Sequence, residues 1–252
     1  MKIRILGGDG GVAPGCHTPS FLLDKKILID AGSAAANLSL EDQKEIDYIF
    51  ISHSHLDHVK DICFLVDNMF TFRKKPIELI SSPEVLESLK QHIFNDKIWP
   101  DFSALSNGRS PILSYRPVTD SVELEGYQIQ LVPVSHTVPA VGFLIKDQAG
   151  VSIIVTGDTG PTEEIWTVAN REKKLKAIFT EIAFPNHLQS VADAACHYTP
   201  RSFSKEVLKL AKYPPFYIYH LKPEFRKELG REIKALKIPK LKLLKLNQRY
   251  TF

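Results

Sequence analysis

Tyr48-Ile49-Phe50-Ile51-Ser52-His53-Ser54-His55-Leu56-Asp57-His58 is an apolar run that leads directly into three histidines and an aspartate. The apolar run predicts a buried strand over residues 47–52, and the end of a strand is a rigid place to mount ligands. Imidazole and carboxylate together suit zinc, iron or manganese. Three histidines and an aspartate on one turn exceed what a single tetrahedral ion can use. The motif therefore predicts two adjacent metal ions, held in part by His53, His55, Asp57 and His58.

The clustering of the histidines is the observation that matters. Three of the nine histidines of the chain fall within six residues. A lone histidine such as His92 or His187 is more simply a solvated loop residue, but that explanation does not account for three together.

Length and composition indicate an ordinary globular protein. Of the 252 residues, 44% are hydrophobic and 24% are charged, and the net charge is +3. This charge is too small, and its lysines too scattered, to predict a stable nucleic-acid partner. No signal peptide is recognisable and no apolar run approaches the ~18 residues of a membrane span, so we expect a cytoplasmic protein without a membrane partner.

The pattern of elements changes along the chain. Short β-rich runs at 2–6, 20–23 and 26–30 predict hairpin-linked strands, and further strands are predicted at 76–80, 112–118, 127–133, 141–146, 151–156, 177–181, 216–220 and 240–245. The strands from 112 to 156 look antiparallel. Helices are predicted after Ser39, over 59–70, from Pro83 to about Phe94, and over 161–170, 199–212 and 223–236. Residues 95–110 form an irregular loop.

Each half of the chain thus has a set of strands followed by strand–helix alternation. This predicts two sheets packed face to face with helices outside, a four-layer αββα sandwich of the α/β class. The chain has no linker-like or repeated segment, so a single domain over residues 1–252 is expected.

The motif at residues 53–58 resembles the His-x-His-x-Asp-His signature of the metallo-β-lactamase superfamily. The resemblance continues in order through Asp30, His136, Asp158 and His220. It implies a metallo-β-lactamase fold in which one metal is held by His53, His55 and His136, and the second by Asp57, His58 and His220. Asp158 would bridge the two metals, and Asp30 would orient a ligand histidine.

Three segments resemble those of the class II cyclic-nucleotide phosphodiesterases: residues 157–161, residues 181–186 around Glu181, and residues 197–200 around His197. Residues 220–223 do so as well. The resemblance implies hydrolysis of a 3′,5′-cyclic nucleotide, with cyclic AMP expected first, to the nucleoside 5′-monophosphate. Zinc is the expected metal, with manganese or iron as alternatives.

The implied mechanism gives three residues catalytic roles. Asp57 would ligate one metal and orient the attacking water, while His197 would donate a proton to the leaving 3′-oxygen. Glu181 would hold the other ring nitrogen of His197. The alternative is that His197 only hydrogen-bonds the chain before a helix and Glu181 faces water.

The irregular loop supplies candidate substrate contacts. Trp99 and Phe102 are candidates for stacking on the base, and Arg109 for contact with phosphate or with a second subunit. Simple packing is the competing explanation for the two aromatic residues.

Two rival functions remain open at the level of the sequence. One is an RNA phosphodiesterase resembling the tRNA 3′-processing endonucleases, for which no basic arm is visible. The other is a metal or nucleotide sensor without turnover, which the full ligand set disfavours. Lactonase, thioesterase and β-lactamase activities leave Glu181 and His197 without a role. A homodimer is expected from the resemblance alone.

Overall fold

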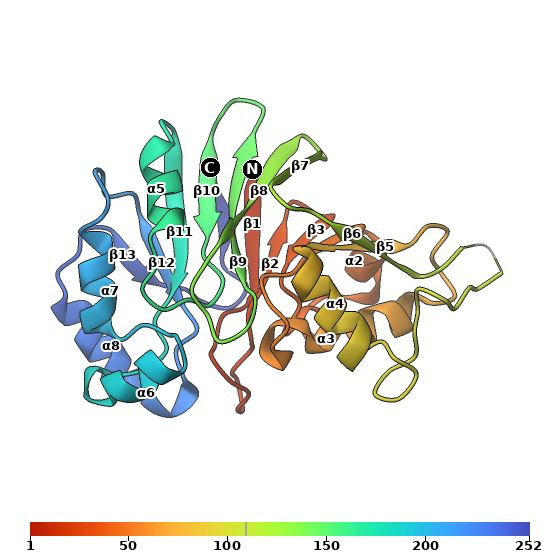
Figure 1. The fold of residues 1–252 in the computed structure, drawn as a ribbon, viewed down its shortest axis with the longest axis horizontal. Coiled ribbons are helices and arrows are strands. Elements are labelled where there is room, and N and C mark those ends of the chain that lie inside the picture. The colour runs from red at the N-terminus through yellow and green to blue at the C-terminus, as the bar shows by residue number, and fades with distance from the viewer. Residues whose placement is uncertain (109) are drawn as a thin grey trace.

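The computed structural model describes residues 1–108 and 110–252. It contains two seven-stranded sheets that pack face to face (Figure 1). The strand order is β14-β1-β2-β3-β4-β5-β6 in the first sheet and β13-β12-β11-β10-β9-β8-β7 in the second. Each half of the chain therefore builds one sheet, apart from the last strand, β14 (Arg249–Thr251), which returns to pair with the first.

The first sheet begins antiparallel and continues parallel. Its antiparallel strands are β1 (Lys2–Gly7), β2 (Ser20–Leu23) and β3 (Ile27–Ile29), and its parallel strands are β4 (Tyr48–Phe50), β5 (Ile77–Ser81) and β6 (Leu113–Pro117). Its helices are α1 (Ala34–Asn37), α2 (Leu40–Lys44), α3 (Leu56–Met69) and α4 (Pro83–His92). Ser39 and Ser82 cap α2 and α4 as expected, because each side-chain oxygen accepts from a backbone N–H of the first turn.

The second sheet has the same plan. Its antiparallel strands are β7 (Ser121–Leu124), β8 (Tyr127–Pro133), β9 (Val141–Asp147) and β10 (Ser152–Val155), and its parallel strands are β11 (Leu175–Glu181), β12 (Phe216–Tyr219) and β13 (Leu241–Leu243). Its helices are α5 (Glu164–Arg171), α6 (Gln189–Ala194), α7 (Pro200–Val207) and α8 (Arg226–Ala235). Two short 3₁₀ turns, Asn186–Leu188 and Pro223–Phe225, precede α6 and α8.

Three apolar clusters separate four layers. The central cluster lies between the sheets, where Phe50 meets Phe143 and Phe21 meets Phe179. A second cluster lies under α1 to α4 and a third under α5, α7 and α8, which flank the sheets on opposite sides in Figure 1. The four-layer αββα sandwich predicted from the sequence is confirmed, whereas the single domain over residues 1–252 stays a prediction.

Some predicted elements need correction. The strand at 112–118 is not part of the antiparallel set, because β6 pairs parallel with β5 in the first sheet. The helix predicted over 199–212 ends at Val207. Strands β7 and β14 and helices α1 and α6 were not predicted, since each is only three to six residues long and has too few residues to show a period.

The topology explains why residues far apart in sequence meet. Parallel strands present their carboxyl ends at the same edge of a sheet, and loops at that edge collect side chains from several strands. Asp30 follows β3, the histidine motif follows β4, and Asp158 follows β10. His220 follows β12, while Glu181 is the last residue of β11.

Candidate metal centre

The seven predicted ligands come together in two adjoining groups. In the first group are His53, His55 and His136; in the second are Asp57, His58, Asp158 and His220. Within each group the candidate ligand atoms all lie within 4.8 Å of one another. The division matches the one implied by the resemblance, apart from Asp158, which groups with the second set and also reaches the first.

The first group consists of imidazoles alone. His55 Nδ1 and His136 Nε2 face each other at 3.2 Å. The ring of His53 lies 4.7 Å from each of theirs, measured between centroids. His136 donates from its other nitrogen, Nδ1, to the Cys196 carbonyl. That hydrogen bond leaves the lone pair of Nε2 directed at the shared point, which is the arrangement of a metal ligand.

The second group combines carboxylates with imidazoles. Asp158 Oδ2 lies 3.0 Å from His220 Nε2, 3.2 Å from His58 Nε2 and 3.8 Å from His53 Nε2. His220 Nε2 also donates to Asp57 Oδ2 at 3.2 Å. Asp158 thus lies between the two groups, where a bridging ligand would have to be.

Asp30 holds the ligand histidines from behind. Its Oδ2 accepts a 2.7 Å hydrogen bond from His58 Nδ1 and a 2.8 Å hydrogen bond from the Ser52 hydroxyl. The Ser52 hydroxyl in turn lies 3.0 Å from His53 Nδ1. Through this chain one buried carboxylate fixes the tautomers of two histidines, so that Nε2 of each points into the site. Ser52 was not singled out in the sequence, although it directly precedes the motif.

The backbone around the ligands is unusual in conformation and in packing. Asp30, Cys196 and His220 have left-handed φ angles of 56°, 51° and 64°. Gly32 is required for a different reason, because a Cβ there would overlap the backbone carbonyl of Asp57. These tight approaches place the Asp30 turn directly against the histidine motif.

Unpaired buried atoms test whether a metal fits. His53 Nε2, His58 Nε2 and Asp158 Oδ1 are buried and make no hydrogen bond. Leaving such groups unpaired costs about 1–3 kcal/mol each. Of the eight buried unpaired side-chain atoms in the described residues, four belong to this cluster, His220 Nδ1 included, and the other four lie on Trp99, Tyr115, Ser152 and Tyr250. A nitrogen and oxygen donor set of this kind suits divalent zinc, manganese or iron. The residues present therefore fit divalent metal ions.

Charge is distributed differently in the two groups. Burial holds the pKa of His53 well below its usual range and that of His136 at about 4. Burial also disfavours charge on His220 and His58. However, the neighbouring carboxylates raise the pKa of His220 to about 9 and that of His58 well above its usual range. The first group is thus neutral without metal, whereas the second contains internal ion pairs.

The pair predicted as an acid and its partner is also present. His197 Nδ1 lies 2.7 Å from Glu181 Oε1, and Glu181 is fully buried. The same oxygen accepts from the backbone N–H of Thr159, which lies next to Asp158. The His197 ring stacks on that of His220, with centroids 5.1 Å apart. The alternative in which Glu181 faces water is therefore wrong.

The predicted substrate contacts fare differently from one another. Phe102 is 4% exposed and packs against Phe70 in the core. Because neither face of its ring is open to a ligand, the predicted stacking on a base is wrong. Trp99 is partly buried beside Phe64, and its role stays a prediction. Arg109 lies outside the described residues.

Two residues near His197 were missed. The Phe184 ring lies 5.8 Å from the His197 ring between centroids, and Lys222 Nζ lies 5.8 Å from the centre of the Phe184 ring. Both residues lie in segments that resemble the phosphodiesterases. The usable signal was their position, three residues after Glu181 and two after His220.

None of the helices in the described part of the chain combines the length and the hydropathy that crossing a bilayer requires.

The fold and the histidine–aspartate cluster are those of the metallo-β-lactamase class of hydrolases. The model of the beta-lactamase superfamily domain matches residues 25–217, and the chain belongs to this family.

Similar proteins point to the phosphodiesterases within this class of hydrolases. The probable 3′,5′-cyclic-nucleotide phosphodiesterase of Yersinia pestis is 27% identical, over 96% of this chain and 83% of that protein. The ribonuclease Z of Metallosphaera sedula is 26% identical, over 71% of this chain and 60% of that protein. The crystal structure of unliganded yeast PDE1 superposes with a TM-score of 0.81 at 18% identity, over 98% of both chains. The predicted resemblance to class II cyclic-nucleotide phosphodiesterases is confirmed.

Proposed function

We propose that this protein is a metal-dependent phosphodiesterase that hydrolyses a 3′,5′-cyclic nucleotide to the nucleoside 5′-monophosphate, with cyclic AMP as the first candidate. The observation that carries the proposal is the Glu181–His197 pair beside the two ligand groups. A phosphodiester has a poor leaving group, and a buried, oriented imidazole next to the metal centre is a suitable proton donor for it.

Two divalent metal ions, with zinc as the first candidate, would be held by the two groups of ligands and bridged by Asp158. When bound, such ions stabilise charge on phosphoryl oxygens and activate water for in-line attack. This dinuclear arrangement is part of the proposal, and its support is the unpaired donor atoms of His53, His58 and Asp158.

The protein's own residues have separate tasks. Asp57 accepts a hydrogen bond from His220 and lies at the exposed side of the second group, with 28% of its side chain accessible, where it would orient the attacking water. Glu181 accepts from His197 Nδ1 and so directs Nε2 towards the site. His197 Nε2 would then hold the proton that the leaving 3′-oxygen takes.

The deciding experiment is hydrolysis of 3′,5′-cyclic AMP by the purified protein as isolated. We expect release of 5′-AMP alone, loss of activity after chelation, and recovery with zinc, manganese or iron. Release of 3′-AMP would contradict the assigned leaving group, and no turnover with any of the three metals would refute the substrate class. Cyclic GMP measured in parallel tests the base preference.

An RNA phosphodiesterase is the second candidate, since a ribonuclease Z is among the relatives. A tRNA precursor with a 3′ extension, assayed beside cyclic AMP, separates the two. Cleavage of the precursor at a higher kcat/KM than cyclic AMP would favour this candidate.

The homodimer stays a prediction, which sedimentation equilibrium tests.

A further inference from the structure

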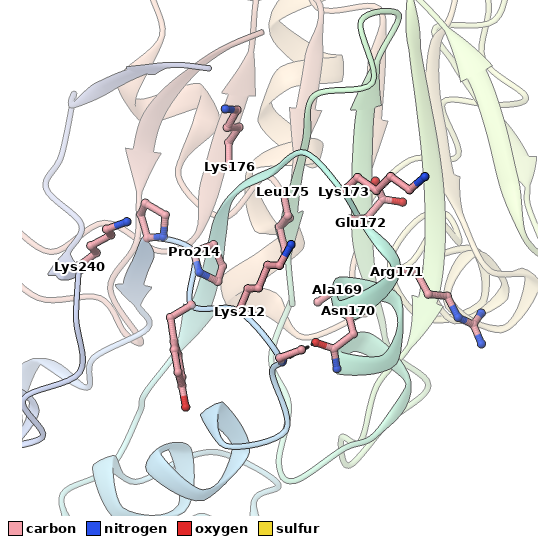
Figure 2. A pocket seen from close by; sticks show the side chains of 13 residues that line it. Ala169, Asn170, Arg171, Glu172, Lys173, Leu175, Lys176, Lys212, Pro214 and Lys240 are labelled. Carbon is pink, nitrogen blue, oxygen red and sulfur yellow. Dashed lines mark hydrogen bonds between the residues drawn. The ribbon is translucent and has the colours of Figure 1, made fainter.

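A second cavity lies away from the metal centre and is lined by lysine and arginine. Its volume is about 460 Å³, within the range of small-molecule sites. It is formed by the end of α5 with the loop that follows, by the loop between α7 and β12, and by Lys240 ahead of β13 (Figure 2). The metal centre lies at the opposite ends of the same strands.

The lining is strongly positive. It contains five cationic side chains and one carboxylate: Arg171, Lys173, Lys176, Lys212 and Lys240, and Glu172. Glu172 is already paired with Lys146, which reaches it from β9 at 2.7 Å. The lining is thus more positive than the chain as a whole, whose net charge is +3.

The five cations are not neutralised by direct ion pairs within the described part of the chain. None of them forms an ion pair there, and all five are exposed. Other exposed lysines, such as Lys97 and Lys227, also lack an ion pair, so what sets these five apart is that they line one cavity. Like charges gathered in a concave surface repel one another and focus a positive potential, which an anion relieves.

The remaining lining adds apolar contacts. Tyr213 is 44% exposed, and Ala169, Leu175, Pro214 and Pro215 complete the wall. An exposed aromatic ring beside cations suits a flat ring carrying phosphate groups better than a bare inorganic ion. In Figure 2, Lys212 points towards the middle of the pocket and Lys240 lies at its edge, whereas Lys173, Lys176 and the guanidinium of Arg171 point outward.

We propose that this pocket is a second binding site, for a nucleoside polyphosphate, with Lys212 and Lys240 contacting the phosphates and Tyr213 contacting the base. A small ligand is favoured over a nucleic acid because the positive charge is confined to a pocket. The proposal does not depend on which phosphodiester the metal centre cleaves.

Titration of the metal-loaded enzyme with adenosine 5′-triphosphate tests the site. The Lys212→Gln/Lys240→Gln variant should bind at least about tenfold more weakly than wild type, because it loses two charge-assisted contacts. The matched control is Lys97→Gln/Lys227→Gln, which removes two exposed lysines outside the pocket and should bind as wild type does. Tyr213→Ala should weaken the triphosphate but leave inorganic tripolyphosphate unchanged.

Because a triphosphate also binds metals, its position must be read directly. Amide hydrogen exchange of the wild-type protein should slow at residues 169–176 and 211–213 on adding the triphosphate. Protection confined to the metal centre, or equal weakening in the pocket and control variants, would overturn the proposal. Preference for single-stranded RNA over the triphosphate would overturn it in favour of a nucleic-acid surface.

Discussion

Two buried polar clusters of this protein differ in how completely their atoms are paired. At one, Arg73 donates to Asp47 and to the carbonyls of Lys44, Ile46, Lys75 and Pro76. At the metal centre, His53 Nε2, His58 Nε2 and Asp158 Oδ1 are buried and make no hydrogen bond, although His58 Nε2 lies 3.2 Å from Asp158 Oδ2. The first cluster is complete without a ligand, and the second is incomplete. Single unpaired buried atoms also occur elsewhere, as at Ser152 and Tyr250, so it is the convergence of several unpaired nitrogen and oxygen atoms on one point that distinguishes this cluster from a structural ion pair.

The sharpest test of this contrast is Asp158→Ala. Because Asp158 touches both ligand groups, the rate on a cyclic nucleotide should fall by at least about 10⁴-fold, as expected when metal stabilisation of the phosphate is lost. Elemental analysis should show fewer than two metals per chain. Asp193→Ala, an exposed aspartate on α6, is the control and should keep both. Full activity in Asp158→Ala would remove the bridging role.

The second test concerns His197, which is paired like the structural cluster but faces the metal centre. His197→Gln should lower kcat by about 10²- to 10⁴-fold, the usual contribution of a general acid, while metal content stays unchanged. His187→Gln is a matched control, since His187 pairs with Glu228 at the surface and should be dispensable. An unchanged kcat in His197→Gln would refute the proton donor.

The third test addresses the fully paired cluster around Arg73, where we expect an effect on stability and none on activity. Arg73→Ala leaves the Asp47 carboxylate buried beside only Lys75, so the free energy of unfolding should fall by about 3 kcal/mol. The activity of the folded fraction should be unchanged. Arg116→Ala, whose partner Glu78 forms a half-exposed pair, should cost less than about 1 kcal/mol. Urea denaturation measures both variants. Equal losses would show that the burial of Arg73 is not what matters.

The fourth test examines the support behind the ligands. Asp30→Asn keeps the shape but weakens the acceptor for His58, so metal affinity or activity should fall about 10- to 100-fold. Asp67→Asn, on the exposed face of α3, is the control. If metal affinity stayed at the wild-type value, Asp30 would only hold the turn.

The smallest effect is expected from pH. Burial opposes ionisation of Asp47, but its hydrogen bonds with Lys75 and Arg73 prevail and lower its pKa. A lowered pKa in the folded state contributes stability above the unfolded-state value of about 3.9, and this is lost as the pH falls through the folded value. The free energy of unfolding should therefore decline less steeply below pH 4 in Asp47→Asn than in wild type. Parallel curves would contradict this assignment.

The sequence pointed to the candidate metal ligands in two ways: the four at residues 53–58 through their residue types and spacing, and His136, Asp158 and His220 through the family resemblance. It did not predict the position of β6 or the existence of β14, since these depend on pairing between distant segments. The stacking role of Phe102 failed for a similar reason: whether an aromatic residue in a loop faces inwards is decided by neighbours such as Phe70. The role of Trp99 in the same loop stays a prediction.

The basic pocket could not be predicted from the sequence for the same reason. Its five cations are spread from residue 171 to residue 240, and in the sequence the lysines look scattered. Only the parallel arrangement of β11, β12 and β13 brings the loops at their amino ends together. By contrast, Phe184 and Lys222 lie in segments that the sequence had already marked, and only their proximity to His197 was missing.

The left-handed backbone at residues 30, 196 and 220 implies a trade-off between stability and function. A left-handed conformation costs a non-glycine residue about 1–2 kcal/mol, and glycine would avoid that cost. At Asp30 and His220 a glycine would remove a side chain that the metal centre uses. Cys196 contributes only its carbonyl oxygen, to His136. Thermostabilising design can therefore begin at position 196, whereas the same change at the other two would exchange catalysis for stability.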